Sequence, residues 1–578
     1  MDTRPHRAIL LLGAVLIGGV VTVAQVGRGW SDWPTPYADA QRTSWLRTDQ
    51  KISIESMSKP GFDLQWTSRL ENQRRGLQGF TQGVTASGVT LFVPVSIVAG
   101  SSNNLFMLDN DTGHLIWSRR FEGPLPAAGV PDARTMRVGV ESTGPCTGGI
   151  TAAPTRIVNG AAEPTPSPGA TPVPPPAGGN QQGYRSSLGE PGQGIPVEPR
   201  APRPGAAPGS AGGPGRGAPA RPQAPRIPGA PDLGSGGLGR AMVAYAVAGD
   251  GQLHVVGLQS GKDLQKPAPF LPANSQWSNP VAVGTMMYAA TIGKCASAPH
   301  GVYAIDLDAA DKPVVSYRTN GGSVVGSVAF SSDGNTLLAA IGPGRLTADG
   351  KANAIVALDP RTLKLKDWFT QPAAEFVTGP TVFRHGAKDV VAAATRDGRV
   401  MLLDVASLGG ANHATPLMAS PSLVASGGSI AAEALATWAR GPEERWILVP
   451  LSGRTSDARA TNGAIRTGAV VALRVAEARG VFSLEPQWTS NDLTTPATPI
   501  IVNGVVFALS SGRPAVAGSG SPAVLYAYDG VSGKALWNSS RSMATFASPG
   551  SYWSALSQVY VGTDDGTVHA FGFLDERR

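Results

Sequence analysis

Short apolar stretches separated by turn residues recur along most of the chain. Residues 524–540, VLYAYDGVSGKALWNSS, illustrate the pattern: an apolar stretch ends at Asp529, a small-residue turn follows, and a second apolar stretch ends at Trp537. Short apolar runs bounded by Gly, Asp and Ser are typical of β-strands joined by tight turns. Long amphipathic helices need more Glu, Lys and Leu than this chain contains, since charged residues make up only 15%. The pattern therefore predicts an all-β fold.

The strands are arranged in longer repeating units. A unit begins with a Pro-containing strand and continues through an apolar strand, an Asp-Gly hairpin and a strand that ends in Leu-Asp or Tyr-Asp. A Thr-Gly or Ser-Gly turn and a strand that often carries Trp complete it. Asp-Gly hairpins are expected at 250–251, 397–398 and 565–566. About eight units occur, and repeats spaced by tens of residues indicate a propeller or array. Because a four-stranded sheet cannot bury both faces alone, we expect a single eight-bladed β-propeller over residues 30–578.

The two ends of the repeat array complement each other. The last unit ends one strand early, at Phe573. Residues 61–70, GFDLQWTSRL, have the pattern of an outermost strand with no unit before it. We therefore expect this N-terminal strand to complete the C-terminal blade and close the ring.

A Pro-, Gly- and Ala-rich segment, residues 160–239, interrupts the repeats. It includes PTPSPGATPVPPPAGGN and lacks apolar periodicity, so it cannot bury enough apolar surface to offset the entropy cost of ordering. A linker between two domains is one interpretation. Strand-like sequence on both sides, GGITAAPTRIVNG before and AMVAYAVAGDGQLHVVGLQSGK after, favours a disordered insertion within the second blade.

The net charge of +7 does not indicate a nucleic-acid partner. Nucleic-acid binding needs a concentrated basic patch on a folded face. Part of the excess charge instead lies in and beside the Pro-rich segment, at Arg185, Arg200, Arg203, Arg216, Arg221, Arg226 and Arg240. We interpret this charge as that of a solvated basic segment.

The N-terminus has the composition of an export signal. MDTRPHR precedes the apolar run AILLLGAVLIGGVVTVA, residues 8–24, which ends in Thr22-Val23-Ala24 and fits the small-x-small rule for signal-peptide cleavage. The run is short for a membrane span of about 20 residues. We expect residues 1–24 to be a cleaved signal peptide, with an uncleaved anchor as the alternative. In either case the remainder is exported to the periplasm or the extracellular space, and only an uncleaved N-terminal segment would contact the membrane.

The chain has two cysteines, Cys146 and Cys295. An oxidising compartment outside the cytoplasm permits a disulfide between them. Two free buried thiols are the alternative, and a free-thiol count on the native protein would separate the two cases.

Two motifs resemble the quinoprotein dehydrogenase family, whose members bind pyrroloquinoline quinone (PQQ). The phrase Asp109-x-x-Thr112-Gly113-x-x-x-Trp117 resembles the family's repeat, and residues 524–540 echo it with Ser532 in the Thr place. Residues 32–52 resemble the family's N-terminal segment, with matching positions at Trp33, Asp39, Arg42, Ser44, Leu46 and Ile52. The resemblance runs from about residue 30 to the end, without the Pro-rich segment, and implies the propeller fold. Non-enzymatic propellers of the outer-membrane assembly lipoprotein type look similar at this level.

The repeated phrase does not itself require a cofactor. Asp and Thr or Ser beside Gly form side-chain-to-backbone hydrogen bonds that fix a tight turn. The Trp is a large apolar side chain whose ring can pack against the next blade. We therefore interpret the repeated motif as a structural element of the fold that fixes a turn and packs one repeat unit against the next.

The residues that the family uses to hold its quinone and calcium ion do not match here. Calcium takes oxygen ligands, yet the Asn expected after a third-blade strand is replaced by Lys294, whose ammonium has no acceptor. In the second-blade stretch where a Glu ligand is expected, Asp250 is the only acid, and it falls in a predicted hairpin. The loop expected to carry the general base, YRTNGGSVVGS, contains no acid, and the family's adjacent-cysteine pair is absent. The sequence thus predicts no intact quinone–calcium site and no catalytic or metal-ligating residue.

Two functions remain for such a chain. The first is a binding or scaffold propeller in the cell envelope, without a cofactor, that holds an envelope protein or a small ligand. The second is a divergent PQQ-dependent alcohol or sugar dehydrogenase with calcium. Predicted loops and opening strands supply five candidate residues at the mouth of the channel, with ordinary blade packing as the alternative for each; they are Trp277, Lys294, His300, Tyr552 and Trp553.

Overall fold

The computed structural model describes residues 32–573 apart from several gaps. The gaps are 74–78, 88–92, 124, 126–148, 151, 159–241, 274, 293–298, 321, 345–350, 372–374, 431–432, 442–443, 457–459 and 515–519. The described residues all belong to one compact unit, made of 1–165 with 232–578. The expected signal peptide (1–24) and the expected insertion (160–239) lie outside the described residues. Within the described part of the chain, no helix is long and apolar enough to cross a membrane.

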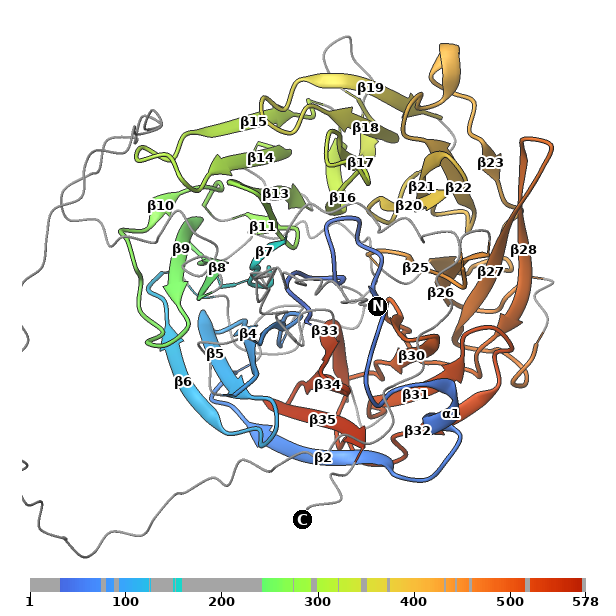
Figure 1. The fold of residues 1–578 in the computed structure, drawn as a ribbon. Helices are drawn as coiled ribbons and strands as arrows, with labels where there is room; N and C mark the ends of the chain where they lie inside the picture. Colours follow the sequence, from blue (N-terminus) through green and yellow to red (C-terminus); the bar gives the residue numbers. More distant parts are fainter. Residues whose placement is uncertain are drawn as a thin grey trace, which may run out of the picture. The chain divides into compact units, whose positions relative to one another are not determined.

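The fold is all-β, as the sequence predicts. In the described residues the only helical elements are one turn, α1 (Ile54–Met57), and one 3-10 turn, η1 (Gly410–Asn412). The sheets follow one another in sequence order, and consecutive strands within a sheet are mostly antiparallel neighbours (Figure 1).

The sheets of the first half have these strands. The first contains β3 (Val84–Ala86), β4 (Val95–Gly100), β5 (Asn104–Asp109) and β6 (Leu115–Arg120). The second contains β8 (Val243–Val247), β9 (Gln252–Gly257) and β10 (Ala268–Pro269). A ten-stranded assembly contains β7 (Ile157–Val158), β11 (Gln276–Trp277), β12 (Val281–Val283), β13 (Met286–Ile292), β14 (Gly301–Asp306), β15 (Val314–Arg318), β16 (Gly322–Phe330), β17 (Leu337–Gly344), β18 (Ala354–Leu358) and β19 (Leu365–Thr370).

The sheets of the second half have these strands. One contains β20 (Thr381–His385), β21 (Lys388–Ala394), β22 (Val400–Asp404) and β23 (Met418–Ala419). The next contains β24 (Ser429–Ile430), β25 (Ala436–Ala439), β26 (Arg445–Ser452), β27 (Gly468–Ala478) and β28 (Val481–Thr489). Another contains β1 (Trp45–Leu46), β29 (Ile500–Val502), β30 (Val505–Ser510), β31 (Val524–Asp529) and β32 (Ala535–Asn538). The last contains β2 (Phe62–Arg69), β33 (Ala547–Ala555), β34 (Gln558–Thr563) and β35 (Thr567–Phe573).

The N-terminal strand pairs with the last strand of the chain. β2 is antiparallel to β35, with Phe62 opposite Phe573 and Arg69 opposite Thr567. The two ends of the described chain therefore share one sheet, in the order β2-β35-β34-β33. The pairing expected for residues 61–70 is present.

Hydrophobic cores lie between successive sheets. One core joins Leu402 of the sheet β20–β23 to Ile447 and Val471 of the sheet β24–β28. Another joins Phe571 of the last sheet to Phe106 of the first. Each sheet thus buries its faces against its neighbours, and burial of apolar surface at about 25 cal/mol per Å² makes these contacts the main source of stability.

The recurrent Asp turns have the structural role that the sequence suggests. Asp529 Oδ1 accepts hydrogen bonds from the backbone N–H groups of Val531 and Ser532 at 2.8 and 3.1 Å, and Gly533 follows with φ of 71°. Trp488 of the preceding sheet packs on Gly533, and its indole N–H donates to Gly530 O at 3.0 Å. The tryptophan side chain thus packs against the next sheet, as predicted.

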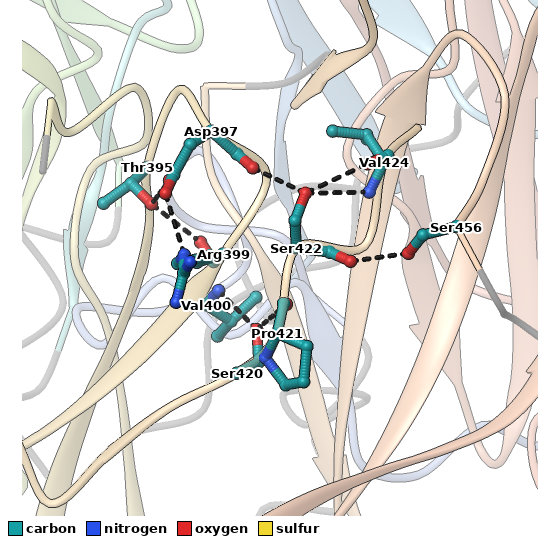
Figure 2. A network of polar contacts seen from close by, with 9 residues as sticks. All are labelled: Thr395, Asp397, Arg399, Val400, Ser420, Pro421, Ser422, Val424 and Ser456. Atoms are coloured by element: carbon teal, nitrogen blue, oxygen red, sulfur yellow. Dashed lines mark hydrogen bonds and ion pairs between the residues drawn. The ribbon is translucent and has the colours of Figure 1, made fainter. Parts of the chain in front are cut away.

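The Asp-Gly hairpin at 397–398 shows how a turn is fixed to the following sheet (Figure 2). Thr395 Oγ1 donates to Asp397 Oδ1 at 2.5 Å, and Arg399 Nε donates to Asp397 Oδ2 at 2.8 Å. Ser422 Oγ donates to Asp397 O at 2.7 Å, and Ser456 Oγ donates to Ser422 O at 2.5 Å. This polar network is structural: it satisfies turn and loop backbone groups.

Candidate functional site

Residues 33–46 lie along the inner strands of the sheets. The carbonyl groups of this segment, called here the axial segment, accept backbone N–H hydrogen bonds of 2.8–3.0 Å from six successive parts of the chain. The pairs are Trp33 with Thr85, Pro34 with Arg156, Ala40 with Phe330, Gln41 with Val382, Thr43 with Thr437, and Ser44 with Ile501. Each donor lies in or beside the opening strand of a different repeat unit. The axial segment therefore ties the units together at their centre.

The backbone of the axial segment is unusual. Tyr37, Ala38, Arg42 and Ser44 all have φ between 56° and 73°. Left-handed conformations are uncommon for residues other than glycine, and they persist where the surroundings determine them. Here the hydrogen bonds to successive units supply those surroundings, and they orient Tyr37 and Arg42.

Arg42 occupies the polar centre of the axial segment. Its side chain is 1% exposed. Its guanidinium donates to Val328 O at 2.9 Å, Pro36 O at 2.7 Å and Asn279 O at 3.1 Å. Burial lowers the pKa of Arg42 to about 10, and the nearby Tyr37 and Asp39 partly oppose this shift. Three carbonyl groups from separate parts of the chain thus compensate a buried cation.

Tyr37, which is buried, and Glu433, which is partly buried, form a phenol–carboxyl pair next to this cation. Tyr37 Oη donates to Glu433 Oε2 at 3.2 Å. Burial raises the pKa of Glu433, and the hydrogen bond from Tyr37 partly opposes that shift. Burial and the carboxylate of Glu433 both raise the pKa of Tyr37. The pair can hold a proton at a site shielded from bulk water.

Close backbone contacts hold Glu433 in place. Gly379 N donates to Glu433 O at 2.8 Å. A Cβ atom on Gly326 would lie 2.5 Å from that same carbonyl oxygen, and one on Gly379 would lie 2.6 Å from Ser327 O. Only glycine permits such approach at these two positions. Residues in or beside the opening strands of three units therefore meet at the backbone carbonyl of Glu433.

The described residues do not fit a calcium ion that carries a quinone. Calcium takes six to eight oxygen ligands, usually including several carboxylates. No group of three or more His, Cys, Asp or Glu residues that could hold a metal ion occurs in the described part of the chain. Glu433 is hydrogen-bonded to Tyr37, which also lies near the Arg42 guanidinium, and Asp250 Oδ1 accepts Gln252 N within the predicted hairpin. We derive no chemistry through a quinone here.

Of the five residues proposed for the channel mouth, three aromatic residues are buried in hydrophobic cores. Trp277, Tyr552 and Trp553 are at most 1% exposed and lie in hydrophobic cores. Tyr552 donates to Thr498 O, and Trp553 donates to Ser96 Oγ at 3.1 Å. His300 is partly exposed beside a gap, and its carbonyl accepts Thr319 N. Lys294 and the expected Cys146–Cys295 bridge lie outside the described residues.

The residues of the polar centre were not identified as a site from the sequence. Arg42 and its neighbours were noted only as part of the N-terminal segment that resembles the quinoprotein family. Tyr37 lies within the same segment and could have been grouped with Arg42 on that signal. Glu433 is nearly four hundred residues away and no motif marks it, so only the fold brings it to Tyr37.

Comparisons with known proteins bear on the fold. No protein-family model matches the chain, and no curated protein matches it. Among solved structures, a europium-containing methanol dehydrogenase is 10% identical, with a TM-score of 0.52 over 94% of this chain and 98% of that chain. Quinohemoprotein alcohol dehydrogenase from Comamonas testosteroni is 13% identical, with a TM-score of 0.51 over 95% of this chain and 81% of that chain. Quinohemoprotein alcohol dehydrogenase ADHIIG from Pseudomonas putida HK5 is 11% identical, with a TM-score of 0.52 over 94% of this chain and 80% of that chain.

These likenesses extend over nearly the whole chain, while the identities are low. At such identities a structural likeness defines the fold and leaves the activity open. The expected resemblance is confirmed at that level: the chain has the fold of the PQQ-like, quinoprotein dehydrogenase-type β-propellers.

Proposed function

We propose that this chain is an exported propeller that acts as a binding or scaffold module in the cell envelope, without a quinone–calcium site. Export is inferred from the basic and apolar composition of residues 1–24. Its partner would be an envelope protein or a small ligand.

We further propose that the sheets form a closed ring of eight blades. The ten-stranded assembly divides at the single Ile292–Val324 pair that joins β13 to β16. We assign β7 to the blade of β8–β10, because Thr155 just before β7 bridges to Tyr245 of β8, while Ile157 and Val158 of β7 also pair with β12. Trp66 of the last sheet supports closure, because its indole N–H donates to Asn110 O of the first sheet at 2.9 Å. Its ring packs on Gly113 in the same manner as Trp488 packs on Gly533.

The observation that carries the functional proposal is the composition of the polar centre. It contains a guanidinium, a phenol and one carboxyl group, and each is hydrogen-bonded to another part of the chain. A quinone dehydrogenase of this fold needs instead a set of oxygen ligands for calcium and a carboxylate base. The described carboxylates Asp109, Asp359 and Asp529 are engaged in turns.

A reconstitution experiment tests this proposal. The exported protein is incubated with PQQ and CaCl₂, desalted, and examined for quinone absorbance and for dye reduction with a panel of alcohols and aldoses. We expect no retained quinone and no dye reduction. Stoichiometric bound quinone with substrate-dependent dye reduction would overturn the proposal in favour of a divergent PQQ-dependent dehydrogenase.

A further inference from the structure

A cleft of about 430 Å³ lies between the sheet β24–β28 and the sheet that contains β29–β32. Its lining includes Trp45, Arg47, Ile54, Trp438, Arg440 and Asp529. This volume is in the range of about 300–1,000 Å³ that small-molecule sites occupy. The cleft is separate from the polar centre, so its role does not depend on whether a quinone binds the chain.

Gly504 lies in the wall of this cleft. Gly530 N donates to Gly504 O at 2.9 Å, and at the matching place in the first sheet Asn110 N donates to Pro94 O at 3.0 Å. The strand registers agree, because Val505 pairs with Asp529 as Val95 pairs with Asp109.

Glycine thus replaces proline at the cleft wall. A Cβ atom on Gly504 would make ordinary van der Waals contact with Ile54 at 3.6 Å and Trp438 at 3.9 Å. Ala439, which also lines the cleft, adds little volume. Gly504 and Ala439 are thus the small residues of the cleft lining.

The walls are apolar and the charged groups are mainly cationic. Trp45, Ile54 and Trp438 supply flat or aliphatic surface, and Trp438 is 4% exposed and stacks on Trp446 with ring centroids 6.0 Å apart. The Arg47 guanidinium lies 4.5 Å from the centre of the Trp45 ring and 3.7 Å from Asp39. Arg440 is exposed at the rim.

The one carboxylate in the lining is partly used. Asp529 Oδ1 accepts two backbone N–H groups of its own turn. The lining therefore carries two guanidinium groups and one carboxylate, and Arg47 also lies 3.7 Å from Asp39, outside the lining. Guanidinium forks recognise carboxylates and phosphates by paired hydrogen bonds. From this arrangement we propose that the cleft binds a small organic anion, in which a carboxylate or phosphate meets Arg440 and Arg47 and a planar apolar body lies against Trp45 and Trp438.

Simple aromatic anions test the proposal. Benzoate and phenyl phosphate are titrated into the full exported protein by calorimetry and by tryptophan fluorescence, with benzamide as the uncharged analogue. We expect saturable 1:1 binding of the anions, and weaker binding of benzamide. Comparison of benzoate with phenyl phosphate identifies which anionic group the cleft prefers.

Two variants and a matched control assign the site. Arg440→Gln should weaken anion binding by about tenfold or more, the usual effect of a lost charged hydrogen bond, and Ala439→Phe should block the cleft without a change of charge. Arg361→Gln is the control, because Arg361 is exposed in the Asp359 turn, the equivalent in another sheet of the Asp529 turn. Arg361→Gln should bind as the parent does. No saturable anion binding by the parent protein, or unchanged binding by Arg440→Gln, would overturn the proposal.

Discussion

At the residue scale, the pair of Tyr37 and Glu433 is the most consequential feature. Its oxygen atoms are 3.2 Å apart; Tyr37 is buried and Glu433 is partly buried. Desolvation favours the neutral form of a carboxyl group, so the pKa of Glu433 is raised. Such a group couples the stability of the fold to pH.

The sign of this coupling is defined by linkage. A carboxyl group whose pKa is raised in the folded state binds its proton more tightly there than in the unfolded chain. Its stabilising contribution to the free energy of unfolding is fully present below the ordinary Glu pKa of about 4.3. This contribution is lost as the pH rises through the pKa of the group in the folded state. The free energy of unfolding of the parent protein should therefore fall, relative to Glu433→Gln, as the pH rises above that ordinary value.

Urea unfolding of both proteins over a pH series measures this difference. Glu55→Gln is a suitable contrast, because Lys59 lies 2.7 Å from the exposed Glu55 and lowers its pKa. Its contribution has the opposite sign and is lost as the pH falls. A parent-to-Glu433→Gln difference that does not vary with pH would contradict the assignment of a raised pKa.

Sequence reasoning has a clear limit at this scale. Trp277, Tyr552 and Trp553 were selected as aromatic residues near predicted loops, but residue type and position do not separate a packing role from a binding role. The structure places all three side chains in cores. Glu433 was not selected, because its environment arises only from the convergence of distant strands.

At the scale of elements, the repeated turn joins one sheet to the next. An Asp-anchored turn presents a glycine with positive φ, and a tryptophan from the preceding sheet packs on that glycine. The structural role of the Asp-x-x-Thr/Ser-Gly turn could be predicted from sequence, because all of its hydrogen bonds join residues that are close in the chain. For each tryptophan, the sequence predicts that the ring packs against the next repeat unit, but it does not identify the residue that the ring contacts.

Alanine substitutions at Gly533 and Gly386 distinguish the energetic cost of overpacking from the cost of a left-handed backbone conformation. A Cβ atom on Gly533 would lie 2.5 Å from the Trp488 ring, whereas one on Gly386 would meet nothing within 4 Å; both residues have positive φ. Gly386→Ala should show only the cost of a left-handed alanine, about 1–2 kcal/mol. Gly533→Ala should cost about 1–3 kcal/mol more, because the added methyl overpacks the interface. Equal losses in urea unfolding would contradict the packing role of Trp488.

At the scale of the whole molecule, the N-terminal region has two tasks. Residues 33–46 bond to the opening strands of successive units, and β2 pairs with β35. The pairing of β2 with β35 could be predicted from sequence. The last repeat unit ends one strand early, and residues 61–70 have the pattern of a strand that belongs to no other unit. The path of residues 33–46 along the inner strands could not be predicted from sequence. Its hydrogen bonds are made by backbone carbonyl groups, which every residue type has.

The closed ring can be tested most directly by hydrogen exchange measured with mass spectrometry. If β2 is an integral strand of the last blade, the amides of residues 62–69 should exchange slowly and in the same cooperative class as those of β35, because both then open only with the whole sheet. The contrary result would be rapid exchange of residues 62–69 while β34 and β35 stay protected. Such a result would show that the N-terminal strand is only loosely attached and that the ring is open.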